Sequence, residues 1–298
     1  MPNVEELVVL SQEVRDALDT GAPLVALETT LVAHGFPAPD GVEVGLASEA
    51  AVRSAGAVPA TIGVLDGRIR VGLAPSDLER FTPEARKAGP RDLAACAVQG
   101  AVGATTVGGA LTVAGWAGIP FLGTGGIGGV HRGFPFPPDV SADVPAIART
   151  QALVVSSGAK SLLDVPATVE VLETLGVPVL GFRTDTLPLF YSAEGGPPIP
   201  QRVEEAAEAA QIAAAHWALA GAGLLLANPP PASLDVEDLI ESALSEAAAT
   251  GISGQAVTPF VLSFLHERSD GRTRGVNRSL IVENARLAGE VAVAFAAL

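Results

Sequence analysis

The chain has 298 residues, a formal net charge of −15 at pH 7 and charged side chains at only 17% of its positions. No basic run is longer than a dipeptide, which argues against a nucleic-acid groove, although a local pocket could still bind a phosphorylated small molecule. No apolar stretch is long enough to span a membrane, the N-terminus does not resemble a signal peptide, and the single Cys96 allows no internal disulfide, so we expect a cytoplasmic protein.

Apolar spacing and turn residues predict helices that alternate with short strands. From the N-terminus onward, we expect a helix over 4–19, a strand over 23–27, a helix over 41–55, a hairpin over 61–73, helices over 91–102 and 105–117, strands over 120–123 and 153–156, a helix over 164–175, a strand over 177–182, a helix over 201–220, a strand over 223–227, and helices over 235–249, 258–267 and 278–297. The hairpin is expected because Asp66-Gly67 separates two apolar runs.

The alternation between residues 100 and 230 indicates a three-layer α/β/α architecture with a mixed, mainly parallel central sheet. Pro-rich stretches at 135–138, 197–200 and 229–231 are interpreted as loops within one domain that covers residues 1–298. Ligands of such sheets bind at the carboxyl ends of the strands. This rule places Glu28, the loop that begins at Thr124, Lys160 and Asn228 at one rim.

A glycine-rich loop follows the strand over 120–123. It holds six glycines between Gly123 and Gly133. Without Cβ atoms, successive backbone N–H groups can turn toward one anion, and Thr124, His131 and Arg132 could add donors. A tightly packed turn is the alternative. The spacing matches neither the dinucleotide fingerprint nor a P-loop.

Two carboxylates bracket a hydroxyl in the segment Asp139-Val-Ser141-Ala-Asp143. Hard oxygen ligands of this kind suit Mg²⁺ or Mn²⁺, which commonly take one or two carboxylates plus waters. Ordinary capping of the following helix is the alternative. The sequence has no closely spaced His/Cys cluster, which argues against structural zinc.

Lysine is scarce, since two lysines compare with sixteen arginines. An amine that loses its proton can form a Schiff base with a sugar carbonyl, whereas arginine cannot. Lys160 follows an apolar strand and a Gly-Ala turn, and a site poor in water would favour its nucleophilic form. A surface lysine at a strand end is the alternative. Lys87 lies in the basic patch from Arg86 to Arg91 and is interpreted as an anion clamp.

Glu28 ends the apolar run over 24–27, where a carboxyl group can act as a general acid or can cap the next helix. His34 is expected near the same rim. Two other histidines are interpreted as structural, with His216 packed in an Ala-rich helix and His266 at the surface.

These segments, in this order, resemble the pseudouridine-5′-phosphate glycosidase family. The segments that carry the resemblance include ALETTLVAHGFPAPDG (26–41), GATTVGGA (103–110), FLGTGGIGGVHRG (121–133), DVSAD (139–143), SSGAKSLLD (156–164) and ANPPP (227–231). The resemblance covers nearly the full chain. It implies the reversible cleavage of pseudouridine 5′-phosphate by water to uracil and ribose 5-phosphate, a divalent metal, typically Mn²⁺, and a homotrimer.

Motif by motif, the resemblance implies that Lys160 is the Schiff-base nucleophile, Glu28 the proton donor and Asp139 the metal ligand. It also implies five substrate contacts, at Lys87, Val107, Ser141, Ala142 and Asp143. Two prolines depart from the family pattern. Pro138 precedes the metal aspartate, and Pro90 occupies a position where a basic residue is common.

The chemistry of the implied reaction agrees with these residue types. Paired carboxylates suffice to expel a leaving oxygen, but a carbon leaving group needs the additional help of an amine at C1′. Two other classes remain open. A ribokinase-like sugar kinase would require ATP, and a non-catalytic phosphosugar-binding protein would not need the isolated Lys160.

Overall fold

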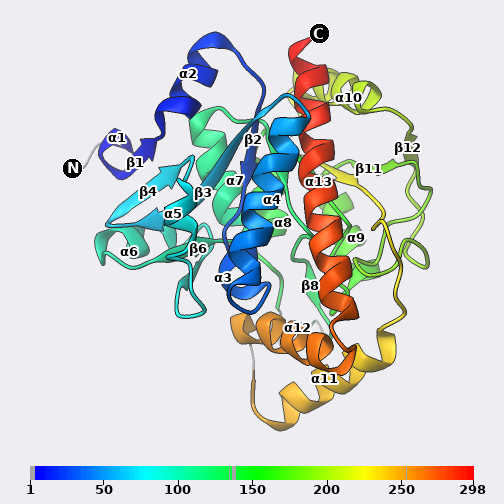
Figure 1. Ribbon diagram of the computed structural model, residues 1–298. Coiled ribbons are helices and arrows are strands. Elements are labelled where there is room, and N and C mark those ends of the chain that lie inside the picture. The colour runs from blue at the N-terminus through cyan, green and yellow to red at the C-terminus, as the bar shows by residue number, and fades with distance from the viewer. Residues whose placement is uncertain (1–3, 134, 136–138, 253) are drawn as a thin grey trace.

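A computed structural model describes residues 4–133, 135, 139–252 and 254–298 of the chain (Figure 1). Within these residues a sheet of eleven strands lies between two layers of helices. The expected three-layer α/β/α architecture with a mixed, mainly parallel sheet is confirmed. No helix in the described ranges is long and apolar enough to cross a membrane.

The central sheet has the strand order β1-β4-β3-β2-β7-β9-β13-β11-β12, and β6 pairs with both β3 and β5. The antiparallel pairs are β3 with β4 and β3 with β6, and the remaining pairs are parallel. The strands are β1 (Val8–Leu10), β2 (Leu24–Leu27), β3 (Val58–Leu65), β4 (Arg68–Val71), β5 (Arg86–Ala88), β6 (Gly103–Thr105), β7 (Phe121–Gly123), β9 (Leu153–Ser156), β11 (Val179–Phe182), β12 (Gln201–Val203) and β13 (Leu224–Ala227); β8 (Val130–His131) and β10 (Leu163–Asp164) form a separate pair.

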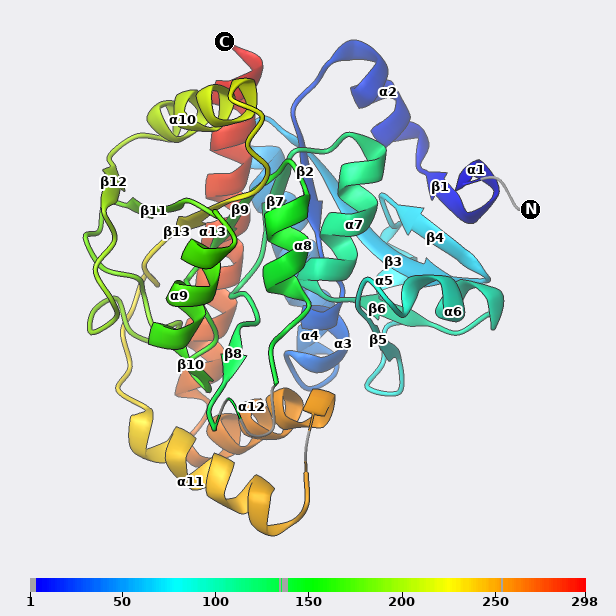
Figure 2. The same ribbon diagram turned by 180° about the vertical axis from the view of Figure 1, so that it is seen from behind.

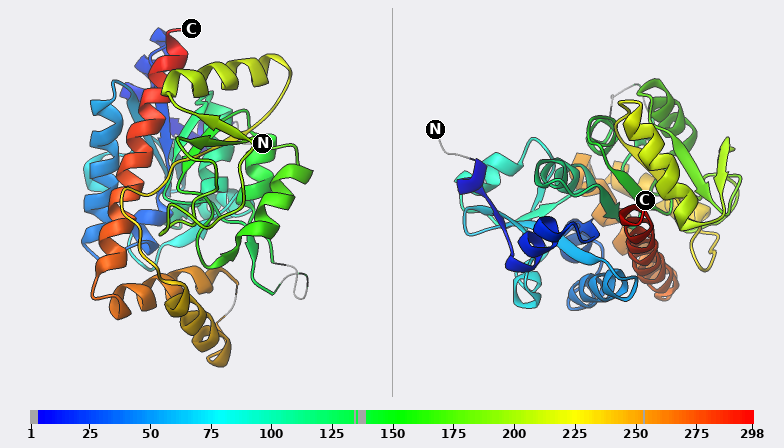
Figure 3. Two further views of the ribbon diagram at one scale, coloured as in Figure 1. Left: turned by 90° about the vertical axis from the view of Figure 1, so that its right-hand side faces the viewer. Right: turned by 90° about the horizontal axis from the view of Figure 1, so that it is seen from above.

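Helices cover both faces of the sheet (Figures 1 and 2). The first face packs against α4 (Asp40–Ser54), α10 (Ala206–Ala218) and α13 (Arg272–Ala296), and the second against α7 (Val107–Ala117), α8 (Asp143–Arg149) and α9 (Val165–Thr174). The remaining helices are α1 (Val4–Leu7), α2 (Gln12–Thr20), α3 (Thr30–His34), α5 (Pro75–Leu78), α6 (Leu93–Val98), η1 (Gly254–Ala256), α11 (Glu237–Ala249) and α12 (Val257–Arg268). The side view separates the three layers and shows α11 and α12 at one end of the molecule (Figure 3).

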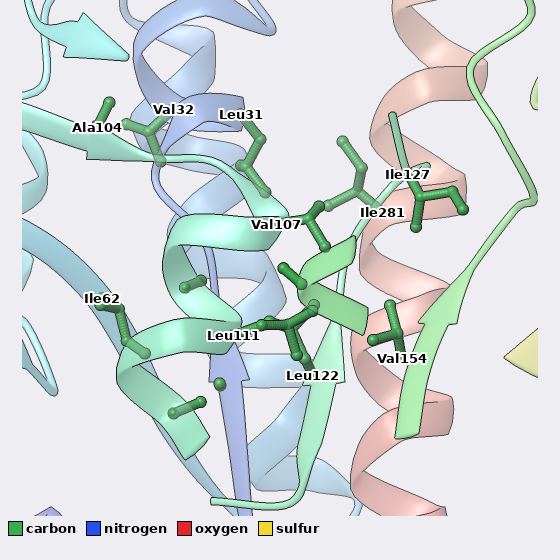
Figure 4. Close-up of a cluster of buried hydrophobic side chains, with 14 of the residues drawn as sticks. Leu31, Val32, Ile62, Ala104, Val107, Leu111, Leu122, Ile127, Val154 and Ile281 are labelled. Atoms are coloured by element: carbon green, nitrogen blue, oxygen red, sulfur yellow. The ribbon is translucent and has the colours of Figure 1, made fainter. Parts of the chain in front are cut away.

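The core is built from the alternate faces of the central strands. Leu122 and Val154 face the α7 side, where they pack with Leu111 (Figure 4), and Ala26 belongs to the same cluster. The residues next to them in the sequence, such as Leu27, Phe121 and Val155, face α13 on the other side of the sheet. Strands that are buried on both faces read as continuous apolar runs, which explains why the short runs over 24–27, 121–123 and 153–156 could be recognised as strands.

The strand register brings the expected rim together. Leu27 of β2 pairs with Gly123 of β7, which in turn pairs with Val155 of β9. On the far side of β9, Ser156 pairs with Ala227 of β13. Because these strands are parallel and adjacent, the residues that follow them leave the sheet at one edge, as predicted.

Three helices were predicted too long, and the helix predicted over 278–297 begins earlier, at Arg272. The helix over 4–19 is interrupted by β1, because Val8–Leu10 pairs in parallel with β4. The helix over 201–220 begins only at Ala206, because residues 201–203 pair with β11. The helix over 91–102 ends at Val98, since Gly100 adopts a left-handed conformation with φ of 64°. In each case tertiary pairing or a turn overrides the local apolar spacing.

Candidate active site

A cavity of about 330 Å³ lies at the carboxyl edge of the central strands. The eight residues to which the family resemblance gives a role line this one cavity: Glu28, Lys87, Val107, Asp139, Ser141, Ala142, Asp143 and Lys160. They come from five separate segments of the chain. The fold therefore brings together the titratable groups that the sequence suggested, in a space whose size falls in the usual range for small-molecule sites.

Glu28 is a buried carboxyl group with an exposed fraction of 6%. Its Oε1 accepts a hydrogen bond of 3.1 Å from the Thr124 hydroxyl, and its Oε2 accepts one of 3.3 Å from the Leu31 N–H. Burial raises the pKa of Glu28, the positive charge of Lys160 lowers it, and the negative charge of Asp143 raises it, with a net rise. A carboxyl group of this kind holds its proton at a higher pH than usual and suits a general acid.

Hydroxyl groups behind Glu28 fix the backbone of its motif. Thr29 and Thr105 both donate to the Ile62 carbonyl, at 2.9 and 2.6 Å, and the Thr105 N–H donates to the Thr29 hydroxyl at 2.9 Å. Thr30 donates to the Thr105 carbonyl at 2.8 Å. These bonds join the LETT and ATTV segments, so the two motifs form one wall of the cavity. Thr29 is the N-cap residue of α3 but makes no side-chain capping bond, and Glu28 supplies one by accepting from the first-turn N–H of Leu31.

Lys160 is half-buried at the end of the segment that follows β9. The backbone N–H of Lys160 donates to the Ile127 carbonyl at 3.1 Å, and the backbone N–H of Ile127 donates in turn to the Gly158 carbonyl at 3.0 Å. Gly158 has φ of 77°, and a Cβ atom there would lie 2.1 Å from the Pro188 carbonyl oxygen. The glycine before Ala159 is thus required by backbone conformation and close packing, and it fixes the direction in which the lysine enters the cavity.

Lys87 lies on β5 beside β6, where it pairs with Ala104. Burial lowers the pKa of Lys87 to about 8, with a further lowering from the positive charge of Lys160, while Glu28 and Asp143 oppose the shift. Both lysines of the chain therefore share one electrostatic environment. The sequence interpretation as an anion clamp is compatible with this position on the cavity wall.

Asp143 is buried, and its carboxylate joins two elements of the site. Oδ1 accepts from the Gly108 N–H and Oδ2 from the Gly128 N–H, both at 2.8 Å. Gly128 belongs to the glycine-rich loop, and a Cβ atom there would lie 2.2 Å from the Ser141 hydroxyl oxygen. Asp143 thus holds the loop against the first turn of α7, and the loop packs tightly instead of forming an open anion cradle at this point.

Val107 begins α7, and its side chain is buried in the core (Figure 4). Thr106 caps the helix by accepting a hydrogen bond of 3.2 Å from Gly109, and Gly108 donates to Asp143. Neither bond uses the Val107 N–H. Since the first-turn N–H groups of a helix have no acceptor within the helix, the backbone of Val107 is the part that can meet a ligand.

Asp139 lies at the mouth of the cavity with its side chain 44% exposed, and its Oδ2 is 3.8 Å from Nδ1 of His131. Within the described ranges no group of three or more His, Cys, Asp or Glu side chains could enclose a metal ion. One accessible carboxylate fits a divalent ion that keeps most of its waters, as Mg²⁺ and Mn²⁺ commonly do. Pro138 lies outside the described residues, and Pro90 lines the cavity.

A smaller inner chamber of about 50 Å³ shares Glu28, Lys87 and Lys160 with the main cavity. Its wall adds Thr124 and Asn277, and Asn277 of α13 is buried with an exposed fraction of 2%. The Asn277 Oδ1 has no hydrogen-bond partner among the described residues. An unpaired buried amide oxygen is costly, so this group is a candidate ligand contact that the sequence interpretation missed.

Asn284, about two turns farther along α13 on the same face, is also buried and was also missed. Its Nδ2 donates to the Thr124 carbonyl at 2.8 Å and to the Ser157 hydroxyl at 3.2 Å, and its Oδ1 accepts from Asn228 at 2.9 Å. This one amide ties together the carboxyl ends of β7, β9 and β13. The available signal was two asparagines, seven positions apart, on the apolar face of a long helix.

The remaining sequence candidates lie beside the cavity. His34 lines the inner chamber, and burial lowers its pKa. Arg132 points away, donating to the Ser161 carbonyl at 2.9 Å and forming an ion pair of 2.6 Å with Glu237. His266, expected at the surface, is half-buried and stacks on Phe36 in a hollow of about 770 Å³. A hollow of about 1060 Å³ beside Arg132 has no cluster of active-site groups.

The chain resembles known proteins over nearly its whole length. Residues 13–294 match the family model described as "Indigoidine synthase A like protein". The chain is 44% identical over 304 residues to the pseudouridine-5′-phosphate glycosidase of Sorangium cellulosum, with 99% of this chain and 96% of that protein covered. It is 47% identical over 300 residues to the protein of the same name from Paracoccus denitrificans, with 97% and 99% covered.

Two solved structures are also similar. The prealnumycin C-glycosynthase AlnA, in complex with ribulose 5-phosphate, superposes with a TM-score of 0.88 at 41% identity, covering 99% of this chain and 98% of that one. An indigoidine synthase A-like protein from Thermotoga maritima gives a TM-score of 0.87 at 37% identity, with 96% of both chains covered. At these identities the similarity lies in the sequence as well as in the fold, and it covers nearly the whole chain.

Proposed function

Because the chain belongs to the indigoidine synthase A-like family, we propose that it cleaves the C–C glycosidic bond of pseudouridine 5′-phosphate reversibly, giving uracil and ribose 5-phosphate. The observation that carries this proposal is the convergence of Glu28, Lys87 and Lys160 on one cavity. Relatives with 44–47% identity carry the name of this glycosidase, and a similar structure binds a pentulose phosphate.

The shape of the cavity supports one orientation of the substrate. Lys87, Ser141 and the first turn of α7 offer a cation, a hydroxyl and a backbone N–H, which are groups that bind phosphate. The inner chamber, which shares Glu28, Lys87 and Lys160 with this cavity, offers the Asn277 amide, which can hydrogen-bond to the N–H groups of a base. The ribose C1′ then lies between these ends, near Glu28 and Lys160.

The proposed steps use these two side chains. The electrons of the uracil ring expel the ribose ring oxygen from C1′, and Glu28 protonates that oxygen. The Lys160 amine adds to C1′ and returns a proton to Glu28, which then protonates C5 of the base. As the C1′–C5 bond breaks, the nitrogen electron pair forms a C1′=N imine and uracil leaves. Water hydrolyses the imine to ribose 5-phosphate and the free amine.

The electrostatics of the site support this assignment. Glu28 must carry a proton at neutral pH, and burial raises its pKa in that direction. Arg could not replace Lys160, because a guanidinium does not lose its proton to become a nucleophile. A non-catalytic phosphosugar-binding protein would need neither the raised pKa of Glu28 nor a second lysine beside it.

We also propose a divalent ion, Mn²⁺ by the family resemblance, held by Asp139 and water. Such an ion would supply positive charge that orders water and substrate oxygens. The accessible carboxylate of Asp139 supports this proposal, since it has no closer ionic partner than His131 at 3.8 Å among the described residues. The family resemblance likewise supports a homotrimer in the cytoplasm, which light scattering and cell fractionation would test.

The direct test is the release of uracil from pseudouridine 5′-phosphate in reactions with and without a chelator. Chromatography measures the uracil that is released. We expect release by the wild-type protein, its loss in Lys160→Arg, and its reduction by the chelator with recovery on adding Mn²⁺. Full turnover by Lys160→Arg would contradict the covalent mechanism, and a requirement for ATP would favour a sugar kinase.

A further inference from the structure

The loop between β11 and β12 holds a bulky residue in a strained backbone conformation. Phe190 has φ of 62°, in the left-handed region that favours glycine. The Tyr191 N–H donates to the Leu189 carbonyl at 2.7 Å, closing a three-residue turn around Phe190. A positive φ at the centre of such a turn marks its rare and strained form.

Backbone hydrogen bonds on all sides hold this turn in place. The Phe190 N–H donates to the Ser157 carbonyl at 3.1 Å, and Leu189 forms a bridge with Gly158. The Tyr191 carbonyl accepts from Leu234 at 2.7 Å. The strained turn is therefore attached directly to the segment that leads to Lys160. Strain of this kind persists only where the surrounding structure enforces it, and it gathers at functional sites.

The ring of Phe190 is directed at the inner chamber. Phe190 is 4% exposed and lines this chamber together with Lys160 and Asn277. It packs against Gly126 of the glycine-rich loop, where a Cβ atom would lie 2.6 Å from Cδ2 of the ring. Any residue with a Cβ atom at position 126 would therefore clash with the Phe190 ring.

Tyr191 follows Phe190 in the turn and is the residue with which Phe190 can be compared. Its ring meets that of Phe190 edge to face, with centroids 4.8 Å apart at 89°. Tyr191 lines the separate hollow beside Arg132 and does not line the inner chamber. Its buried hydroxyl has no hydrogen-bond partner among the described residues. The two aromatic residues thus face different cavities from one strained turn.

We propose that Phe190 is a specificity-determining residue, whose ring forms the apolar face on which the planar base of the substrate stacks. This inference rests on the proposed function and deepens it, because it names the feature of the leaving group that the site selects. Aromatic rings attract planar unsaturated rings in offset or edge-to-face contact, while Asn277 can bind the edge of the same ring. Planar six-membered heterocycles should therefore be preferred over puckered, saturated ones.

The test uses the synthetic direction, with uracil and ribose 5-phosphate as substrates. Phe190→Leu should raise KM for uracil by roughly three- to tenfold, the range that an aromatic stacking contact corresponds to. Borohydride trapping of ribose 5-phosphate on Lys160 requires no base, and its rate should equal that of the wild type. Phe190→Tyr, which keeps the ring, should keep the wild-type KM for uracil. Tyr191→Phe is the matched control and should leave both measurements unchanged.

The outcomes are distinguishable. An unchanged KM for uracil in Phe190→Leu overturns the assignment, and so does an equal loss of trapping, which would show that Phe190 only supports the lysine segment. If Phe190→Leu does not fold, the unbranched Phe190→Met variant is measured by the same two assays, with the same criteria. Failure of the wild type to join uracil and ribose 5-phosphate, together with the absence of any adduct, would instead overturn the proposed function, whatever the behaviour of Phe190.

Discussion

Replacing Lys87 by Met should stabilise the folded protein at neutral pH while impairing its activity. The side chain is mostly buried, and burial together with the charge of Lys160 lowers its pKa to about 8. At pH 7 the folded state must therefore carry a positive charge where a neutral group is preferred. Methionine has a similar length and removes that charge. Active sites often contain groups that function requires and stability disfavours.

The magnitude follows from the shift in pKa. A change from 10.5 to about 8 is about 2.5 units, which corresponds to roughly 3 kcal/mol at 1.36 kcal/mol per unit. Because the folded-state pKa is depressed, the unfolded chain binds more protons between about pH 8 and 10.5, and stability rises with pH across this window. The advantage of Lys87→Met should be full below about pH 8 and absent above about pH 10.5.

The free energy of unfolding of both proteins is measured by urea denaturation at pH 7 and at pH 10.5. In a thermal scan at pH 7, the melting temperature of Lys87→Met should exceed that of the wild type by roughly 5–10 °C. Arg86→Met removes an exposed charge from the neighbouring position and should change stability by less than about 0.5 kcal/mol. A Lys87→Met protein that is less stable at pH 7, or one whose advantage does not change with pH, would refute the reasoning.

Three further predictions concern the walls of the site. Asn284→Leu should lower the free energy of unfolding by about 2–5 kcal/mol, because it leaves buried loop carbonyl groups unpaired; a loss below 0.5 kcal/mol in urea denaturation would contradict this. Asp143→Asn should move the Glu28 limb of the pH–rate profile to lower pH, since the charge of Asp143 raises the pKa of Glu28; a shift to higher pH would contradict this. Glu28→Gln should raise the melting temperature more at pH 8 than at pH 4.5, because a raised folded-state pKa makes the ionised carboxyl unfavourable above it; an equal effect at both pH values would be the opposing result.

Much of the fold could be predicted because the central strands are buried on both faces. The run over 153–156 was identified at its exact bounds, and the hairpin at Asp66-Gly67 was identified from its turn residues. The two-residue strands β8 and β10 gave no local signal, because pairing between distant segments alone defines them. The same reason explains the missed strand at residues 201–203.

The site was predictable to the extent that its residues follow strands. Glu28 comes directly after an apolar run, and Lys160 follows another after a short Ser-Gly-Ala turn, so the rule for parallel sheets placed them at one rim. Asn277 and Phe190 belong to a C-terminal helix and to a loop, and only tertiary packing brings them to the inner chamber. The role of Asp143 in tying two backbone segments also depends on distances that no sequence pattern states.

In the proposed reaction, Lys160 forms a covalent imine with the ribose. The most direct measurement is borohydride reduction in the presence of ribose 5-phosphate, followed by proteolysis and mass mapping of the modified peptide. We expect one reduced pentose phosphate adduct per chain, on Lys160, and none in Lys160→Arg. An adduct on Lys87, or no adduct while uracil is still released, would contradict it.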